Sequence, residues 1–292
     1  MLLKNPFENK LSKPLILDGA LGSYIQQKGF LTDEVLWTTN INHNNPDLII
    51  QTLLEYIHAG ADIITTNTFR TNPASLFRAS KTNSAKYAKE AVDLAKQAAL
   101  GRKVLIAGSN PPAEDCYQSN RTVNSNALEM NHKNHIDLLI DNGVDFVLNE
   151  TQSHFDEIQI ICEHCDRNSI PCVVSLYVLD TVKILSGESL DTILSFLRDQ
   201  EIMAIGFNCI SPSLFLKIIG SIQLPEKWGY YLNCGSGHTT DKIIKCGIQP
   251  NEYLKSVKKS LAYKPVFIGS CCGSSPSHTK KIREFLDGQI YS

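Results

Sequence analysis

The sequence predicts an α/β protein, with a single (β/α)8 barrel of the TIM type occupying residues 1–292. Eight short apolar runs alternate with eight stretches of helical pattern, and neither a long linker nor a low-complexity segment interrupts the series. An open, doubly wound sheet would share this alternation. Eight units favour closure into a barrel, so we expect one domain.

The expected strands are near-continuous apolar runs rather than alternating ones. This pattern is typical of parallel strands that are covered on both faces, with a helix as the crossover after each strand. The runs are LILDG (15–19), DIITTNTF (62–69), KVLIAGS (103–109), DFVLNET (145–151), CVVSLYV (172–178), MAIGFNC (203–209), WGYYLNC (228–234) and VFIGSCC (266–272).

The expected helices lie between these runs. The first, within residues 45–60, has Pro46 near its start and Gly60 at its end. Residues 84–102 are rich in alanine, a strong helix former. The others are expected within residues 125–143, 154–168, 189–200, 211–222, 251–262 and 275–288.

Composition and charge exclude several classes of partner. The chain has 28 basic and 30 acidic residues, for a net charge of −2, which gives no electrostatic basis for binding nucleic acid. The N-terminal stretch has no continuous apolar run, and no segment reaches the ~18 apolar residues of a membrane-spanning helix. We therefore expect a soluble, cytoplasmic protein that binds neither a membrane nor a nucleic acid.

Three of the nine cysteines draw attention at the ends of two predicted strands. Cys209 ends the run 203–209, and the adjacent Cys271 and Cys272 end the run 266–272. In a closed barrel only one strand would separate the strand at 203–209 from the strand at 266–272. Such barrels place their chemistry at the C-terminal ends of the strands. The three thiols are therefore expected to converge on one point. Disulfides are a poor explanation in a chain without an export signal.

Three convergent thiolates would leave one position of a tetrahedral Zn²⁺ open, as in catalytic rather than structural sites. Three buried thiols without a metal are the alternative, but a vicinal pair with a third cysteine at matching depth favours the metal site. An all-thiolate centre suits a fourth ligand that is itself a thiol, which loses its proton on binding. A free thiol with a pKa of ~8.5 is mostly protonated at neutral pH. The pattern therefore predicts a thiol substrate.

Cys162 and Cys165 form a C-x-x-C motif that looks like a second metal or redox site. The motif falls within the helix expected at 154–168, on the wall of the barrel, and no second C-x-x-C completes a four-cysteine site. We therefore interpret Cys162 and Cys165 as packing residues on a half-buried face of the helix.

Two acidic residues, Asp18 and Glu150, also end predicted strands. Each could bind an amino group, and capping of the next helix is the alternative, above all for Asp18. Gly19 and Gly22 leave the backbone open beside Asp18, so amide N–H groups there could receive a carboxylate. An acid beside exposed amides would match the two ends of an amino acid.

Five motifs together resemble one known family. They are LDGALGS (17–23), AGADIITTNTF (59–69), NET (149–151), GFNC (206–209) and IGSCCGSSPSH (268–278). In this order they are similar to the zinc-dependent homocysteine S-methyltransferases. That group includes enzymes dependent on S-methylmethionine or S-adenosylmethionine, betaine–homocysteine methyltransferase, and the N-terminal module of cobalamin-dependent methionine synthase. The similarity runs from about residue 15 to residue 287.

The resemblance implies a role for each matching residue. Cys209, Cys271 and Cys272 would be the zinc ligands, and homocysteine would bind zinc through its sulfur. Asp18 and Glu150 would lie near the amino group of homocysteine, with the backbone amides of Gly19 and Ala20 at its carboxylate. Transfer of a methyl group to the sulfur would give methionine, with S-methylmethionine or S-adenosylmethionine as the expected donor.

The sequence departs from the family pattern at three positions. Ser270 stands where a glycine usually precedes the cysteine pair, and Cys234 adds a thiol near the expected mouth. Arg70 follows TNTF, where members with cationic donors tend to carry tyrosine or a neutral polar residue. A cation there would repel a sulfonium unless it is neutralised. This departure motivates an alternative function, a thiol-binding module that receives its methyl group from a separate corrinoid or folate partner. A zinc hydrolase is disfavoured by the all-sulfur ligand set.

Overall fold

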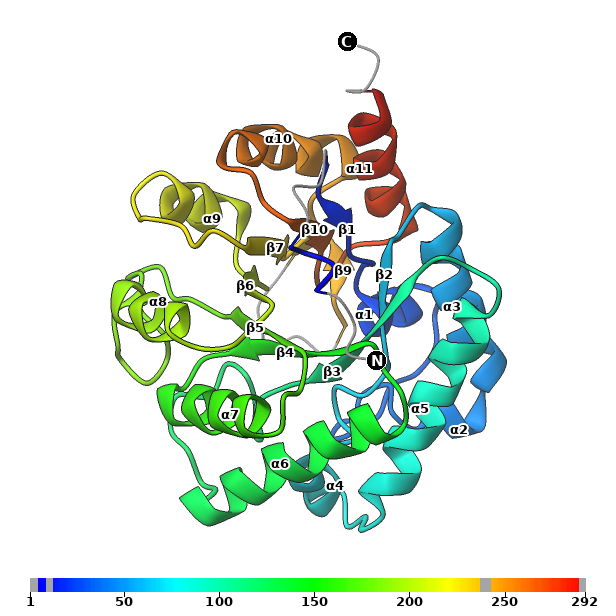
Figure 1. The fold of residues 1–292 in the computed structure, drawn as a ribbon. Helices are drawn as coiled ribbons and strands as arrows, with labels where there is room; N and C mark the ends of the chain where they lie inside the picture. Colours follow the sequence, from blue (N-terminus) through cyan, green and yellow to red (C-terminus); the bar gives the residue numbers. More distant parts are fainter. Residues whose placement is uncertain (1–4, 9–12, 237–242, 289–292) are drawn as a thin grey trace.

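Eight parallel strands form the central sheet of the computed structural model, which describes residues 5–8, 13–236 and 243–288 (Figure 1). Their order is β1-β10-β7-β6-β5-β4-β3-β2, and a parallel bridge between Leu17 and Ile63 joins the two ends into a barrel. The strands are β1 (Leu15–Ile16), β2 (Ile63–Thr65), β3 (Leu105–Asn110), β4 (Phe146–Gln152), β5 (Cys172–Leu176), β6 (Ala204–Asn208), β7 (Trp228–Leu232) and β10 (Phe267–Ser270). The predicted (β/α)8 barrel is confirmed.

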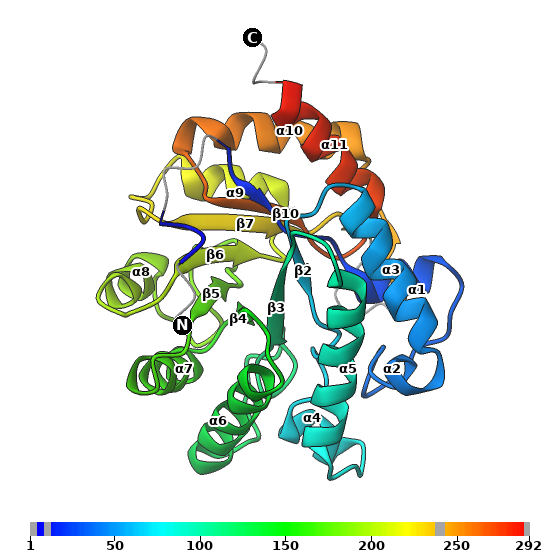
Figure 2. The same ribbon diagram turned by 45° about the vertical axis from the view of Figure 1, so that its right-hand side comes forward.

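A ring of helices covers the outer face of the sheet (Figures 1 and 2). The eight expected helices are all present, as α3 (Pro46–His58), α5 (Ser84–Ala99), α6 (Ser125–Asp141), α7 (Phe155–Arg167), α8 (Leu190–Arg198), α9 (Pro212–Ile219), α10 (Pro250–Ser260) and α11 (Pro276–Gly288). Most begin as the sequence indicates. Asn83, Asn124, Ser189 and Ser211 each accept a hydrogen bond from a backbone N–H in the first turn of their helix.

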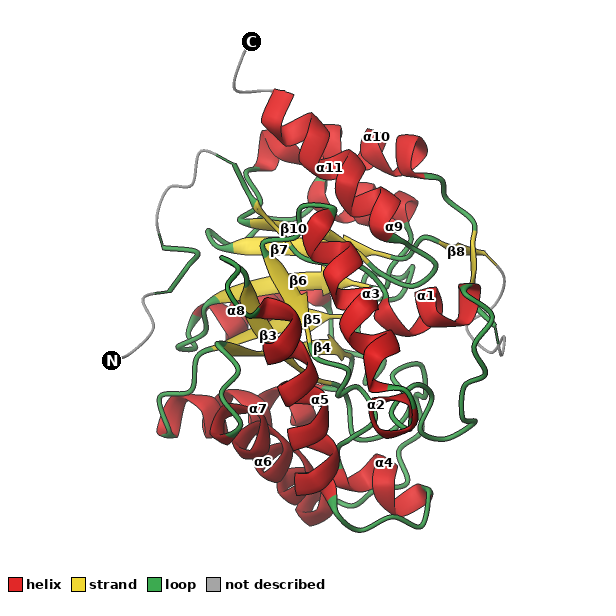
Figure 3. Ribbon diagram, turned by 90° about the vertical axis from the view of Figure 1, so that its right-hand side faces the viewer, coloured by secondary structure: helices red, strands yellow, loops and turns green. Residues whose placement is uncertain are grey.

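Several short elements were not expected, and most lie near the mouth of the barrel. They are α1 (Leu21–Gln27), α2 (Ile41–Asn44), α4 (Pro73–Arg78), the hairpin of β8 (Gly235–Ser236) and β9 (Lys245–Cys246), and the turn η1 (Leu261–Tyr263). Figure 3 shows α1 and β8 toward one end of the barrel, with the segment that carries Phe7 toward the other. No helix within the described ranges is long and apolar enough to cross a membrane.

The core has two layers, one inside the barrel and one between the sheet and the helices. Phe7 belongs to the inner layer, where its ring lies 5.6 Å from the ring of Phe267 and 6.1 Å from that of Phe146. Glycine makes room for Phe267 on the next strand, because a Cβ at Gly229 would lie 2.4 Å from its ring. These aromatic rings fill the lower barrel, so the opening available to a ligand is at the C-terminal end of the strands.

The run 62–69 is shorter as a strand than predicted, because β2 ends at Thr65. Asn67 then holds the chain in a turn: its side-chain amide donates to the Thr38 carbonyl and to Asn42 Oδ1, at 3.1 and 2.7 Å. The Thr38 hydroxyl donates to Asn67 Oδ1 at 2.8 Å. This buried network fixes the segment that carries Phe69 and Arg70 at the mouth of the barrel.

Candidate active site at the mouth of the barrel

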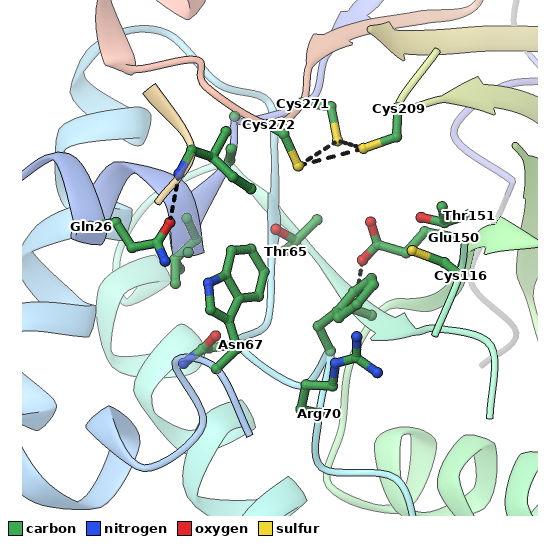
Figure 4. Close-up of a pocket in the computed structure, with 18 of the residues that line it drawn as sticks. Gln26, Thr65, Asn67, Arg70, Cys116, Glu150, Thr151, Cys209, Cys271 and Cys272 are labelled. Atoms are coloured by element: carbon green, nitrogen blue, oxygen red, sulfur yellow. Dashed lines mark hydrogen bonds between the residues drawn. The ribbon is translucent and has the colours of Figure 1, made fainter. Parts of the chain in front are cut away.

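A cavity of about 290 Å³ opens at the C-terminal ends of the strands. Its walls come from β4 and β7 and from the segments after β1, β2, β3, β6 and β10, which lie far apart in the sequence (Figure 4). Its lining includes Asp18, Gly19, Ala20, Glu150, Cys209, Cys271 and Cys272. The structure therefore brings together every residue that the sequence predicted for the site.

The thiols of Cys209, Cys271 and Cys272 form one cluster at the edge of this cavity (Figure 4). Their sulfur atoms are separated by 2.6 Å (Cys209–Cys271), 3.6 Å (Cys209–Cys272) and 4.0 Å (Cys271–Cys272). A tetrahedral zinc with Zn–S bonds of ~2.3 Å needs its sulfurs ~3.8 Å apart. Two of the three separations are close to that value, and the third would lengthen on binding. The donor set fits zinc with one position left for a ligand.

The backbone around the cysteine pair is tightly constrained. Gly273 has a φ of +80°, and a Cβ there would lie 2.5 Å from the backbone of Gly235. The Cys271 amide donates to the Leu232 carbonyl at 2.7 Å, and the Cys234 amide donates to the Cys272 carbonyl at 2.8 Å. These contacts anchor the turn that presents both thiols to Cys209.

The three thiols of the cluster affect one another's pKa values. Hydrogen bonds from the thiols of Cys271 and Cys272 hold the pKa of Cys209 well below its ordinary value, and Tyr117 adds a further hydrogen bond. The pKa values of Cys271 and Cys272 are raised, chiefly by their hydrogen bonds to Cys209. Binding of a metal cation would release the remaining protons of the cluster.

Glu150 is aimed into the cavity by an irregularity in β4. The register with β5 shifts between Asn149 and Gln152, and Thr151 has a φ of +60°. Asn208 secures this bulge, since Oδ1 accepts from the Thr151 amide and Nδ2 donates to the Thr151 hydroxyl, both at 2.8 Å. The carboxylate accepts a hydrogen bond from the Ser109 hydroxyl. Burial raises the pKa of Glu150 to about 8, although the Ser109 bond opposes this.

Asp18 does not cap a helix, which was the alternative to ligand binding. Helix α1 has Ala20 at its N-cap and no side-chain cap. Asp18 Oδ2 instead accepts from the Thr65 amide at 2.7 Å, and the Thr65 hydroxyl donates to the same carboxylate at 3.1 Å. Burial raises the pKa of Asp18 to about 7. A buried acid with a pKa near 7 is readily ionised when a cationic group arrives beside it.

Gly19 and Ala20 lie beside Asp18, where the backbone is packed against α3 and the segment after β10. A Cβ at Gly19 would come within 2.8 Å of the Tyr56 ring and the Ser274 hydroxyl. The Ala20 amide donates to Ser274 Oγ at 3.1 Å. A ligand carboxylate at the Ala20 amide would therefore have to displace the Ser274 hydroxyl.

The sequence did not point to the segment after β3, which supplies Asp115, Cys116 and Tyr117 to the cavity. Its residues come from a loop without a strand-end signature. Behind this loop lie Glu157 and His132 on two helices, and no pattern in the sequence links them to it. Their side chains meet at 2.6 Å, and the same carboxylate accepts from the Ala113 amide at 2.8 Å.

The remaining sequence predictions concern residues outside the site. Cys162 and Cys165 are buried in the apolar layer between α7 and the sheet, as expected of packing residues. Cys234 is buried and is not part of the three-thiol cluster in the described residues. His278 is structural, since Nε2 donates to the Ile248 carbonyl at 2.8 Å.

His135 gives the fold a pH dependence that can be measured. Burial and the neighbouring His132 lower the pKa of His135 to about 3, and its ring nitrogens bond Asn110 Oδ1 and the Thr71 hydroxyl, both at 2.8 Å. The unfolded chain binds a proton here below about pH 6.5 and the folded chain does not, so acid favours unfolding. Between pH 7 and pH 5 this group should lower the free energy of unfolding by about 2 kcal/mol.

The measurement is urea unfolding at both pH values for the wild type and His135→Gln. Glutamine keeps a donor and an acceptor but does not titrate. We expect the variant to lose about 2 kcal/mol less than the wild type over this interval. Equal losses in both proteins would show that His135 does not titrate on unfolding.

Comparison with known sequences finds similarity over nearly the whole chain. The sequence model of the family described as homocysteine S-methyltransferase matches residues 15–286. A betaine-homocysteine S-methyltransferase from Drosophila melanogaster is 26% identical, over 95% of this chain and 96% of the relative. A homocysteine S-methyltransferase from Escherichia coli is 25% identical, over 95% of this chain and 97% of the relative. A selenocysteine methyltransferase from Astragalus bisulcatus is 24% identical, over 96% and 94%.

Among solved structures, the metallated form of the homocysteine methyltransferase MmuM from Escherichia coli has a similar fold. The TM-score is 0.78 at 24% identity, and the match covers 95% of this chain and 100% of the other. The comparison supports the barrel described above and its connectivity.

Proposed function

This chain belongs to the homocysteine S-methyltransferase family, and from that premise we propose a zinc enzyme that methylates homocysteine to methionine, with S-methylmethionine or S-adenosylmethionine as donor. The single observation that carries the zinc assignment is the convergence of Cys209, Cys271 and Cys272 at one edge of the cavity. When bound, zinc would keep the substrate sulfur deprotonated at neutral pH.

The rest of the cavity suits the amino-acid part of homocysteine. Asp18, which is buried, and Glu150, which is half-buried, face the cavity from the segment after β1 and from β4. An ammonium group between them would favour their ionised forms and lower their raised pKa values. The Ala20 amide, released from Ser274, would donate to the substrate carboxylate. These residues would hold homocysteine so that its sulfur points to the three thiols.

The aromatic side chains favour a sulfonium donor. Trp37 and Phe69 line the cavity, with ring centroids 6.1 Å apart in an edge-to-face arrangement. Aromatic faces attract a sulfonium through their quadrupole and exclude water from the path of the methyl group. The cavity lies at the lower end of the size range of small-molecule sites, which favours S-methylmethionine over the larger S-adenosylmethionine.

The test is methionine formation by zinc-loaded protein from homocysteine, with each donor supplied in turn. The panel is S-methylmethionine, S-adenosylmethionine, betaine and a methylcorrinoid, and the product is quantified by mass spectrometry. We expect methionine with a sulfonium donor, and most with S-methylmethionine. Product only with the methylcorrinoid would support the partner-dependent alternative, and no product with any donor would overturn the proposal.

A further inference from the structure

Arg70 is a largely buried cation in the wall of the cavity. Its side chain is 15% exposed, and its guanidinium carbon lies 5.2 Å from the centre of the Phe69 ring. Within the part of the chain that the structure describes, its one ion pair is with Asp115, at 3.6 Å between Nη2 and Oδ2. Figure 4 shows Arg70 and the three thiols at opposite sides of the view, with Glu150 between them.

The hydrogen-bonding capacity of this guanidinium is unused. It has five N–H donors, and the separation from Asp115 exceeds the 2.7–3.2 Å typical of N–H···O bonds. Among the described residues Arg70 donates no hydrogen bond, and the Asp115 side chain is itself 54% exposed. The nearby Arg78, in contrast, donates to the Ala113 carbonyl at 3.0 Å and to the Ser75 hydroxyl at 3.1 Å. The N–H groups of Arg70, which the described residues leave unbonded, therefore remain available to a ligand in the cavity.

We propose that Arg70 binds a carboxylate of the methyl donor, so that the enzyme selects donors in which the sulfonium and a carboxylate belong to one molecule. The guanidinium fork matches a carboxylate in geometry and charge. This assignment rests on the proposed function and names the chemical class of its second substrate.

The same contact explains how a sulfonium can enter beside a cation. A donor without an anionic group would bring its positive charge toward a guanidinium whose ion pair with the half-exposed Asp115 is long, at 3.6 Å, whereas the carboxylate of a zwitterion would pair with Arg70 directly. The donor is then held with its methyl end toward the thiols. In the transfer, a lone pair of the homocysteine thiolate forms the new S–CH₃ bond, and the electrons of the broken CH₃–S⁺ bond stay on the donor as a neutral thioether.

The experiment compares donors that differ only in the carboxylate. One pair is dimethylsulfonioacetate and trimethylsulfonium, and the other is S-methylmethionine and its carboxamide. For each pair, the ratio of kcat/KM values measures the preference for a carboxylate. Arg70→Gln should reduce this ratio about 10- to 100-fold, the loss of one charge-assisted contact worth ~1.5–3 kcal/mol. The ratio for Arg70→Lys should fall between those of the wild type and Arg70→Gln, because lysine keeps the charge but lacks the two-pronged geometry of the guanidinium.

Two further variants separate binding from structure. Asp115→Asn keeps an oxygen to accept the Tyr117 amide hydrogen bond, measured at 2.9 Å, while removing the ion pair. It should keep the preference for the carboxylate, because the guanidinium remains. Arg198→Gln removes the same charge from an exposed side chain on α8 and should match the wild type. A ratio that falls equally in Asp115→Asn and Arg70→Gln would overturn the proposal, as would a ratio unchanged in Arg70→Gln.

Calorimetry separates failure of this inference from failure of the proposed function. Dimethylsulfonioacetate is titrated into zinc-loaded wild type and Arg70→Gln without homocysteine. Weaker binding to the variant supports the anion site even if no donor is turned over. Methionine formation with equal donor binding by both proteins would leave the proposed function intact and contradict the assignment of Arg70.

Discussion

Replacing Cys272 with alanine is expected to remove bound zinc and methyl transfer together while leaving the barrel folded. The substitution takes one of three convergent ligands from the cluster, and no other thiol of the described residues is close enough to replace it. Loss of a metal that contributes several kcal/mol to catalysis should reduce kcat/KM by roughly 1,000-fold or more. Zinc content by mass spectrometry and methionine formation measure the two losses, and circular dichroism checks the fold.

Cys162→Ala is the matched control for this experiment. It removes a buried thiol from α7, within the C-x-x-C motif that most resembles a metal site in the sequence. We expect it to keep one zinc per chain and near wild-type activity, with a modest loss of stability from the cavity that it creates. Zinc retained by Cys272→Ala, or lost from Cys162→Ala, would show that the metal site has been assigned to the wrong cysteines.

Gly273→Ala is expected to unfold more readily and to bind zinc more weakly, although it alters no ligand. The added methyl group would meet the backbone of Gly235 at 2.5 Å, and backbone cannot move aside as a flexible side chain can. The turn after Cys272 must therefore shift. Together with the positive φ, this collision should cost about 3 kcal/mol in the free energy of unfolding.

Gly29→Ala measures how much of that loss of stability comes from the positive φ alone, without a collision. Gly29 has a φ of +86°, close to that of Gly273, but a Cβ there would contact nothing within 4 Å. It should lose only about 1 kcal/mol and keep its zinc affinity. Urea unfolding and competition with a chromogenic chelator give both quantities. If the two variants behave alike, the close approach to Gly235 does not constrain the cysteine pair.

The sequence was most informative where a residue type and its place at a strand end pointed to the same role. The eight strands could be predicted because parallel strands covered on both faces read as apolar runs. Cys209, Cys271 and Cys272 could be predicted as one cluster because strand ends converge in a closed barrel. The same reasoning placed Asp18 and Glu150 at the cavity.

Other features could not be predicted from the sequence because they depend on contacts between segments that lie far apart in it. The bulge that turns Glu150 inward is held by Asn208, which is distant in the sequence from Thr151. Cys116 and Tyr117 enter the cavity on a loop whose path is set by buried polar contacts behind it. Arg70 was recognised as an anomaly, but its unused hydrogen-bond donors are visible only in three dimensions.

The bridge between Leu17 and Ile63, which closes the barrel, is also where the proposed substrate site begins. Strand β1 has only two residues, and beyond it the Asp18 amide donates to the Ile63 carbonyl while its carboxylate accepts from the Thr65 amide. The acid that would receive the substrate thus also fastens the first strand to the second. Local opening of the barrel at this seam would dismantle the binding site, and an occupied site would resist that opening. Ligand binding and the integrity of the closed ring are in this way thermodynamically coupled through one carboxylate.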